Sequence, residues 1–275
     1  MKTLVVYVYK EDASTLPNLQ YFLDFGVSEN AEVDYAIVVN DFACTAKFPA
    51  CKNLRKISRA NSFDLFAYRE AVDSLGIDNY SKFIFLNSSC VGPFLPVYEH
   101  RRWDQVVTSS LSDRIKLVGP IAEFPPDNLG VTSLGKYKSI QPSDANVPFI
   151  HTYMFATDRA GLDILLTYGA FPNHAISKDE AIHVYERLVS SSILNEGFEL
   201  KCFLKRYGSV DISDKKNWKA TKWTPNVASC PEVPGNYDGI DVSPLELIFV
   251  KNLRGSHSHR SVAHSGISSV LGHYL

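Results

Sequence analysis

The chain alternates between short apolar runs and segments whose apolar residues recur at helical spacing. Continuous runs rich in Val, Ile, Phe and Tyr are typical of strands that are buried on both faces of a sheet. Such runs predict strands at residues 3–9, 35–39, 54–58, 82–86, 115–118, 151–156 and 198–203. Helical spacing predicts helices at residues 16–25, 63–75, 158–168 and 177–195. Strands that alternate with helices predict an α/β fold with a mostly parallel central sheet flanked by helices.

The helix predicted at residues 177–195 has the clearest ends. Ser177 and Glu180 form the S-x-x-E pattern of a capping box, and Gly197 follows the last apolar positions. Residues 123–148 are rich in Pro, Gly, Ser and Asp and predict a long surface loop, which is often functional. With 275 residues the chain can bury one sizeable core without disulfides, so we expect a single domain.

Composition excludes some classes of partner and indicates a compartment. The formal net charge of -2 gives no general attraction to nucleic acid or to anionic membranes. The five cysteines are an odd number without C-x-x-C spacing, which is typical of free thiols in a reducing compartment. No apolar run is long enough to span a membrane, and the first is too short for a secretory signal. We therefore expect a soluble, cytoplasmic protein.

Polar residues directly follow two of the predicted strands. The second strand ends at Asn40-Asp41, and the strand before the G-P turn ends at Asn87-Ser88-Ser89. Open α/β sheets bind their ligands at the carboxyl ends of strands, so these positions predict a binding site. The alternative is a polar turn in which Asn and Ser hydrogen-bond their own backbone. The second tripeptide also matches the glycosylation acceptor pattern, which its position beside a buried strand argues against.

Several well-known catalytic patterns are absent from the sequence. It has no G-x-G-x-x-G, Walker A, H-E-x-x-H or G-x-S-x-G motif. Their absence argues against a dinucleotide oxidoreductase, a P-loop enzyme, a zinc protease and an α/β-hydrolase. A nucleotidyltransferase would need a Gly-rich basic loop after the first strand, and YKED at residues 9–12 is not such a loop.

Five segments, taken in order, resemble a known family. They are RANSFDLFAYREA, FIFLNSSCVGPF, HTYMFATDRAGL, KDEAIHVYERLVSSSILNEGFEL and YDGIDVSPLELIFVKNLR, and together they cover roughly residues 3–254. The chain resembles GT-A glycosyltransferases, and more narrowly it is similar to a glycosyltransferase group of algae, plants, protists, bacteria and large algal viruses. The resemblance implies a GT-A-like domain at residues 1–255, with a nucleotide-sugar half (1–120) and an acceptor half (121–255). A Ser/His/Gly-rich tail occupies residues 256–275.

The resemblance also implies an activity. We expect a sugar to be transferred from a nucleotide-sugar donor, UDP-linked by this likeness, to a glycan or glycoprotein acceptor, with inversion at the anomeric carbon. The viral members of the group suggest xylose or a similar small sugar, and a protein acting in the host cytoplasm. The alternative is a catalytically inactive GT-A-like module that binds a nucleotide or a glycan.

The expected metal site departs from the family pattern. GT-A enzymes usually hold Mn²⁺ or Mg²⁺ with a D-x-D motif, and Asn87-Ser88-Ser89 occupies that place here. These ions favour anionic oxygen ligands, so the replacement favours the inactive-module alternative and leaves a metal requirement open. Basic side chains are candidates to neutralise a diphosphate instead, and an ordinary surface charge is the alternative for each. These candidates are Arg59, Lys82, Arg101 and Arg102.

The resemblance assigns further residues to the nucleotide. Asp64, at the start of a predicted helix, would contact the base or the ribose. Its alternative role is a favourable charge near a helix N-terminus. Asn40 and Asp41 would lie near the uracil or the ribose.

Inversion requires a base that takes the proton of the acceptor hydroxyl, and a carboxylate can serve. By likeness to GT-A enzymes, Asp179 is the first candidate, because the capping box already occupies Glu180. Asp158, after the strand at residues 151–156, is the second candidate. Helix-dipole stabilisation is the alternative for both aspartates. Glu186 falls partly on the apolar face of its helix, so it either orients a sugar hydroxyl or pairs with a neighbouring group.

Two further groups have open roles. Trp103, Trp218 and Trp223 fall in predicted loops, where they either stack on an acceptor sugar or pack under the loops. His257, His259 and His264 in the tail are either metal ligands, by likeness to GT-A enzymes, or simply solvated.

Overall fold

A computed structural model describes most of the chain. The described residues are 2–60, 63–123, 148–205, 208, 211–214, 217, 231, 237 and 242–251, with only the backbone of residue 183. The tail at residues 256–275, Trp218, Trp223, Cys230 and most of the loop predicted at residues 123–148 lie outside the described residues.

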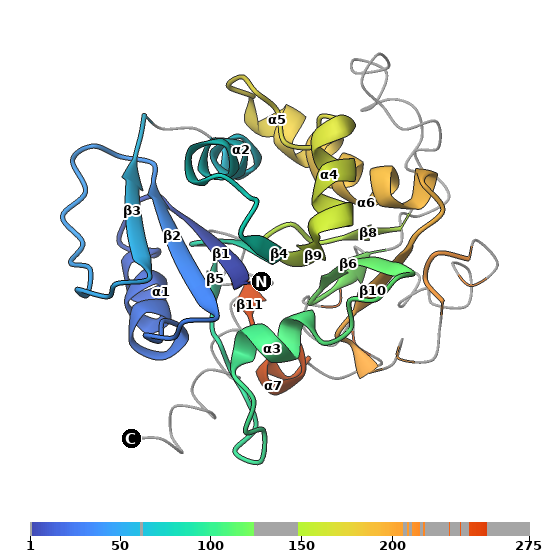
Figure 1. Ribbon diagram of the computed structural model, residues 1–275, viewed down its shortest axis with the longest axis horizontal. Helices are drawn as coiled ribbons and strands as arrows, with labels where there is room; N and C mark the ends of the chain where they lie inside the picture. Colours follow the sequence, from blue (N-terminus) through green and yellow to red (C-terminus); the bar gives the residue numbers. More distant parts are fainter. Residues whose placement is uncertain are drawn as a thin grey trace.

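A seven-stranded sheet forms the centre of the molecule, in the order β10-β6-β9-β4-β1-β2-β3 (Figure 1). Its strands are β1 (Lys2–Tyr9), β2 (Val33–Val39), β3 (Leu54–Ser58), β4 (Tyr80–Asn87), β6 (Ile115–Gly119), β9 (Met154–Asp158) and β10 (Glu199–Cys202). Every neighbouring pair is parallel except those of β9, which runs antiparallel to both β4 and β6. The predicted α/β fold with a mostly parallel central sheet is confirmed.

Within the described residues, two short ribbons and a set of helices accompany the sheet. The ribbons pair β5 (Cys90–Val91) with β11 (Val250–Lys251), and β7 (Ala122–Glu123) with β8 (Phe149–Ile150). The helices are α1 (Leu16–Tyr21), α2 (Asp64–Leu75), α3 (Trp103–Thr108), α4 (Arg159–Thr167), α5 (Lys178–Glu180), α6 (Glu186–Asn195) and α7 (Pro244–Leu247). Two π-helical segments, η1 (Phe22–Gly26) and η3 (Ala181–Tyr185), follow α1 and α5.

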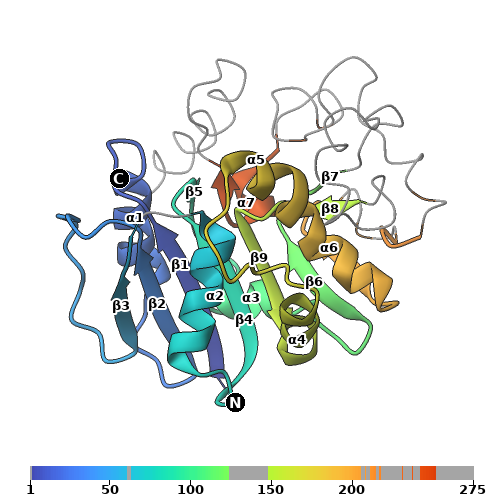
Figure 2. The same ribbon diagram turned by 90° about the horizontal axis from the view of Figure 1, so that it is seen from above.

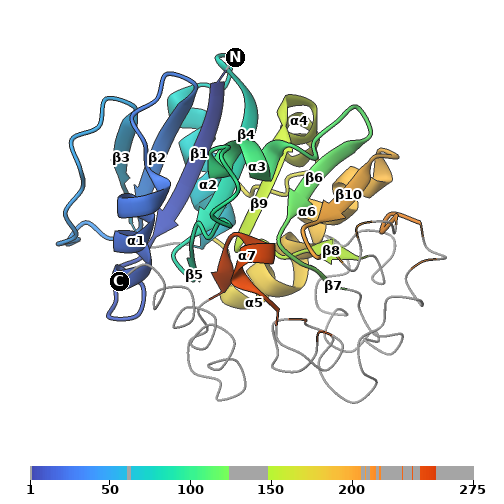
Figure 3. The same cartoon turned by 90° about the horizontal axis from the view of Figure 1, so that it is seen from below.

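Helices cover both faces of the sheet, as a parallel sheet requires. On one face the core includes residues of α2, α4 and α6, such as Tyr68, Leu162 and Val189 (Figure 2). On the other face it includes residues of η1 and α3, such as Phe22 and Val107 (Figure 3). The β-branched and aromatic runs therefore sit between two apolar layers, which explains why they are continuous and do not alternate with polar residues.

Each of the predicted sheet strands is present, with ends shifted by a few residues. The helix predicted at residues 177–195 is present as an unbroken helical run over residues 178–195, in which the π-helical η3 joins α5 to α6. There the Glu186 backbone N–H donates to the Ala181 carbonyl, five residues back. The loop prediction for Trp103 is wrong. This residue begins α3, is buried, and its indole N–H donates to the Gly26 carbonyl at 2.7 Å, so it packs in the core.

Two expectations from composition can be compared with the described residues. Cys44, Cys51, Cys90 and Cys202 are free thiols, as predicted. None of the helices within the described ranges combines the length and the apolar character needed to cross a membrane.

The parallel strands bring their carboxyl ends to one edge of the sheet. In the register, Val8 pairs with Asn87 and Tyr9 pairs with Val39. The antiparallel β9 begins at this same edge, since Met154 pairs with Leu86. Residues that follow β1, β2 and β4 therefore lie close to residues that precede β9, and residues of both groups line a cavity at this edge.

Candidate ligand-binding site

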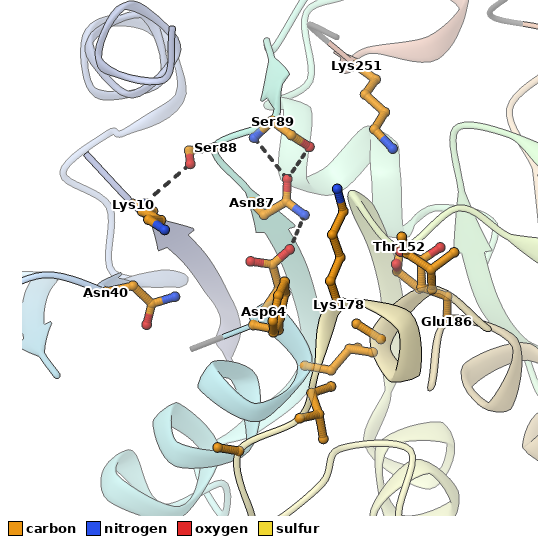
Figure 4. A pocket seen from close by; sticks show the side chains of 16 residues that line it. Lys10, Asn40, Asp64, Asn87, Ser88, Ser89, Thr152, Lys178, Glu186 and Lys251 are labelled. Carbon is orange, nitrogen blue, oxygen red and sulfur yellow. Dashed lines mark hydrogen bonds between the residues drawn. The ribbon is translucent and has the colours of Figure 1, made fainter. Parts of the chain in front are cut away.

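A cavity of about 540 Å³ lies at this edge of the sheet. Its size is within the range of small-molecule and cofactor sites. The cavity is lined by residues within 10–89, from β1, β2, α2 and β4 and the segments that follow them, and by residues within 152–251, which include α5, η3 and β11 (Figure 4). The lining residues are Lys10, Asn40, Phe63, Asp64, Leu65, Asn87, Ser88, Ser89, Thr152, Ala175, Ile176, Lys178, Ala181, Ile182, Glu186 and Lys251.

The Asn87 side chain is held from both sides in the cavity wall. Its amide nitrogen donates to the Asp64 carboxylate at 2.5 Å, and its oxygen accepts from the Ser89 backbone N–H at 2.9 Å and from the Ser89 hydroxyl at 2.5 Å. Asp64 opens α2, where a negative charge is favourable. Asn87 thereby holds one carboxylate and one hydroxyl in place in the cavity wall.

Ser88 connects three elements beside this group. Its backbone N–H donates to the Val8 carbonyl at 2.9 Å, and its own carbonyl accepts from the Asn18 side chain at 2.9 Å. Its hydroxyl lies 3.4 Å from the backbone nitrogen of Lys10, which donates to it. These hydrogen bonds connect the turn after β4 to β1 and α1.

Three lysines bring positive charge to the cavity. Lys10 follows β1, Lys178 begins α5 and Lys251 ends β11. Neither Lys10 nor Lys178 forms an ion pair with any part of the chain that the structure describes. Their positions immediately after a strand and after an N-cap are visible in the sequence, whereas Lys251 reaches the site only through long-range pairing of β11.

The basic residues selected from the sequence lie elsewhere. Arg59 pairs with Glu70 at 2.6 Å and its guanidinium stacks 4.3 Å from the centre of the Phe66 ring. Lys82 donates to the Thr108 hydroxyl at 3.3 Å. The two remaining arginines pair with nearby carboxylates, Arg101 with Glu99 and Arg102 with Asp104 and Glu32. None of the four lines the cavity.

Glu186 is the second carboxylate of the cavity wall. Burial raises the pKa of its carboxyl group, while the charges of Lys251 and His151 and a hydrogen bond with Thr152 act in the opposite direction. The His151 imidazole itself lies 3.0 Å from the Glu123 carboxylate. Glu186 directly follows η3, and π-helical turns occur frequently at functional sites.

The structure separates the aspartates proposed from the sequence. Asp64 lines the cavity, but Asp179 is exposed on α5 and is outside the lining. Asp41 accepts a hydrogen bond from the Ala43 backbone at 2.9 Å and is also outside the lining, whereas its neighbour Asn40 is buried in it.

Asp158 lies at the opposite edge of the sheet. It pairs with Lys82 near the start of β4, since β9 runs antiparallel. Its carboxylate accepts from the Gly161 backbone at 2.9 Å, which caps α4, and lies 2.6 Å from the Lys116 ammonium. These contacts give Asp158 a structural role and do not bring it to the cavity.

The donor groups of the cavity do not suit a resident divalent metal. Mn²⁺ and Mg²⁺ favour several anionic oxygen ligands, but the end of β4 offers an amide and two hydroxyls beside lysines. Within the described ranges, no group of three or more His, Cys, Asp or Glu side chains is arranged to hold a metal ion. His257, His259 and His264 lie outside the described residues.

No protein-family model and no curated protein matches the sequence. Among solved structures, the chain is similar to the mannosyltransferase PcManGT from Pyrobaculum calidifontis in complex with GDP-Man and Mn²⁺. The TM-score is 0.44 at 12% identity, and the match covers 72% of this chain and 54% of that chain. The chain thus spans about half the length of that protein. The fold and the cavity define an α/β protein with a ligand site at the carboxyl ends of its parallel strands.

Proposed function

We propose that the cavity binds a nucleotide sugar and that the protein is a glycosyltransferase. The observation that carries this proposal is the composition of the cavity wall. Polar groups suited to a base and ribose, Asn40, Asp64 and Asn87, share it with lysines suited to a diphosphate. Its position at the carboxyl ends of β1 and β4 is where open α/β sheets bind their ligands.

The sequence resemblance to GT-A enzymes adds support for this assignment. Two of the segments that carry it, FIFLNSSCVGPF and KDEAIHVYERL, contribute Asn87, Ser88 and Ser89 and then Lys178, Ala181, Ile182 and Glu186 to the cavity wall. On that basis we propose a UDP-linked donor, a small sugar such as xylose, and a glycan or glycoprotein acceptor.

The reaction proposed is a single displacement with inversion. The acceptor hydroxyl oxygen bonds to the anomeric carbon of the donor while the bond from that carbon to the diphosphate oxygen breaks. The hydroxyl proton passes to a carboxylate, and the nucleoside diphosphate leaves with the bonding electron pair. Glu186 is the base that the cavity favours, because a carboxylate with a raised pKa accepts a proton more readily. Asp179, exposed on the neighbouring α5, is the second candidate for an acceptor bound at the rim.

A second candidate function is a binding module that holds a nucleotide or a glycan without turnover. The observation that favours it is the replacement of the metal-binding carboxylates by Asn87-Ser88-Ser89. This module would retain affinity for its nucleotide or glycan but would neither hydrolyse a donor nor transfer its sugar.

A calorimetric titration with a panel of UDP- and GDP-sugars, followed by a donor-hydrolysis assay, tests both functions. We expect one donor to bind and to be hydrolysed slowly. Glu186→Gln should abolish turnover and leave donor binding within about twofold, while Asp179→Asn, a neighbouring exposed carboxylate, is the matched control. The reverse result would assign the base to Asp179. Binding without hydrolysis would support a nucleotide-binding module. Failure of every nucleotide sugar to bind would exclude the transferase and leave a module that binds a glycan.

A further inference from the structure

We infer that two lysines replace the divalent cation, so that Lys178 and Lys251 bind the donor diphosphate beside Ser89 without a metal ion. The inference rests on the proposed function, because it concerns the same cavity. It goes beyond that function in assigning the diphosphate subsite and the source of its positive charge.

The fold ties Lys251 to the end of β4. In the β11–β5 ribbon, Lys251 pairs with Cys90, the residue that follows Ser89. The antiparallel register therefore fixes this lysine beside the turn that would carry metal-binding carboxylates in a GT-A enzyme. Its ammonium lies 6.0 Å from the centre of the Tyr153 ring and interacts electrostatically with Glu186. A positive charge is thus built into the wall of the cavity.

Lys178, at the start of α5, lines the same cavity as Lys251. The capping box holds its helix in place, since the Ser177 backbone N–H donates to Glu180 at 2.8 Å and the Ser177 hydroxyl accepts from the Glu180 backbone at 3.2 Å. In Figure 4 the ammonium groups of Lys178 and Lys251 lie to the right of Asn87, and Lys10 lies to its left. The two lysines can therefore approach one diphosphate together, and Lys10 is left for the nucleoside end.

The charge of the cavity favours an anion over a cation. Its charged lining residues are three lysines and two carboxylates. One carboxylate, Asp64, already accepts a hydrogen bond from Asn87, and burial disfavours the charged form of the other, Glu186. A divalent cation would be repelled by ammonium groups at this position, whereas phosphate oxygens accept charge-assisted hydrogen bonds from them.

Lys178 differs from lysines elsewhere in the protein that already pair with a carboxylate. Lys2 and Lys116 pair with carboxylates at 3.1 and 2.6 Å, so their charges are already neutralised. Lys178 has no ion pair among the described residues although it borders a cavity with polar walls. A phosphate group would supply the missing partner.

Titration of the full chain with UDP and with GDP, in EDTA and then in Mn²⁺, tests the inference. We expect the nucleoside diphosphate that binds to do so with the same affinity in EDTA, and the affinity to fall as salt is raised. Lys178→Ala and Lys251→Ala should each weaken diphosphate binding by roughly tenfold to a hundredfold, as expected for one charge-assisted contact. Both should leave binding of the free nucleoside within about twofold.

Lys56→Ala is the matched control, since Lys56 lies on the edge strand β3 and is outside the cavity lining. Lys178 is exposed, so its substitution keeps the test valid even if Lys251→Ala lowers the folding yield. Binding that requires Mn²⁺, or that is unaffected by either lysine variant, would overturn the inference while leaving the proposed function intact. No binding of either nucleotide under any condition would exclude both.

Discussion

Two opposing effects act on the pKa of the Glu186 carboxyl group. Burial in the cavity wall disfavours its carboxylate form and raises the pKa, while Lys251, His151 and a hydrogen bond with Thr152 favour the carboxylate. The raised pKa makes the group a stronger base once it is ionised. The sequence indicated that Glu186 needs a partner, because a charge on an apolar helix face usually has one, but it did not indicate that the partner comes from β11.

The first prediction concerns the pH dependence of Glu186. If it is the base, the rate of sugar transfer should rise with pH through its raised pKa, above the range of an ordinary carboxyl group. The pH–rate profile of kcat/KM measures this, and Glu186→Gln should remove both the activity and this ionisation. A profile whose acid limb lies at the pKa of an ordinary glutamate would contradict the assignment.

The ionisation of Glu186 should lower the stability of the folded protein as pH rises, whereas it should raise the rate of sugar transfer. Because the folded-state pKa is raised, the folded protein holds the proton more tightly than the unfolded chain, and stability falls as pH rises from the unfolded pKa through the folded one. Glu186→Gln should therefore be at least as stable as the wild type at neutral pH. Thermal unfolding at several pH values checks this, and a large loss of stability in the variant would indicate a structural role.

The second prediction concerns Asn87→Asp. The substitution would place two carboxylates within hydrogen-bond distance, since the Asn87 amide lies 2.5 Å from Asp64. One of them must then bind a proton, so the shared pKa is raised and the variant should lose stability as pH increases. We expect a loss of about 1–3 kcal/mol at neutral pH, measured by denaturant unfolding. Ser89→Ala, which removes one hydroxyl without adding charge, is the control, and equal effects of the two variants would contradict the prediction.

At the scale of elements, the segment α5-η3-α6 forms one wall of the cavity. The sequence predicted its start correctly, because the capping box of Ser177 and Glu180 is present. It did not predict η3, because a π-helical turn adds one residue to a turn without leaving a mark in the apolar spacing. Helical periodicity placed Glu186 partly on the apolar face of its helix, and the side chain does line the cavity, but periodicity did not show that a π-helical turn comes directly before it.

The third prediction tests how the cap supports the site. Ser177→Ala removes the hydroxyl that accepts from the Glu180 backbone, and loss of an N-cap costs about 0.5–2 kcal/mol. We expect faster amide exchange in α5 and weaker binding of the diphosphate, because the next residue is Lys178. Hydrogen exchange and calorimetry measure the two effects. Ser112→Ala, in a turn remote from the cavity lining, is the control and should leave binding unchanged.

At the scale of the whole molecule, the central sheet could be predicted from the sequence. The residues of the candidate ligand site could be predicted only in part. Continuous apolar runs such as residues 3–9 and 82–86 identified the strands, because a strand covered on both faces must be apolar throughout. Asn40 and Asn87 were selected because they follow predicted strands, which are local features, and Asp64 was selected by resemblance to GT-A enzymes. Lys251 was not, because its position depends on the pairing of β11 with β5, which no local pattern specifies.

The fourth prediction concerns a ligand that contacts both sides of the cavity. The cavity is lined by α2 and β4 on one side and by α5, η3 and β11 on the other, so a bound nucleotide should stabilise them together. At a ligand concentration of 100 times Kd, the free energy of unfolding should increase by about 2.7 kcal/mol. Hydrogen exchange should show slower opening of both sides, and protection confined to α2 and β4 would contradict a bridging ligand.

The order of the cavity residues along the chain affects its biosynthesis. Chains are made from the N-terminus, and their parts tend to fold as they emerge from the ribosome. The parallel strands β1 to β4 and their polar ends are complete by Asn87, but Lys178 and Lys251 are translated much later. A nascent or prematurely terminated chain that stops after β4 would therefore carry Asn87, Asp64 and Lys10 without Lys178 and Lys251. If the cavity binds a nucleotide as proposed, nucleotide in the cell would stabilise chains translated past Lys251 and leave shorter products to proteolysis.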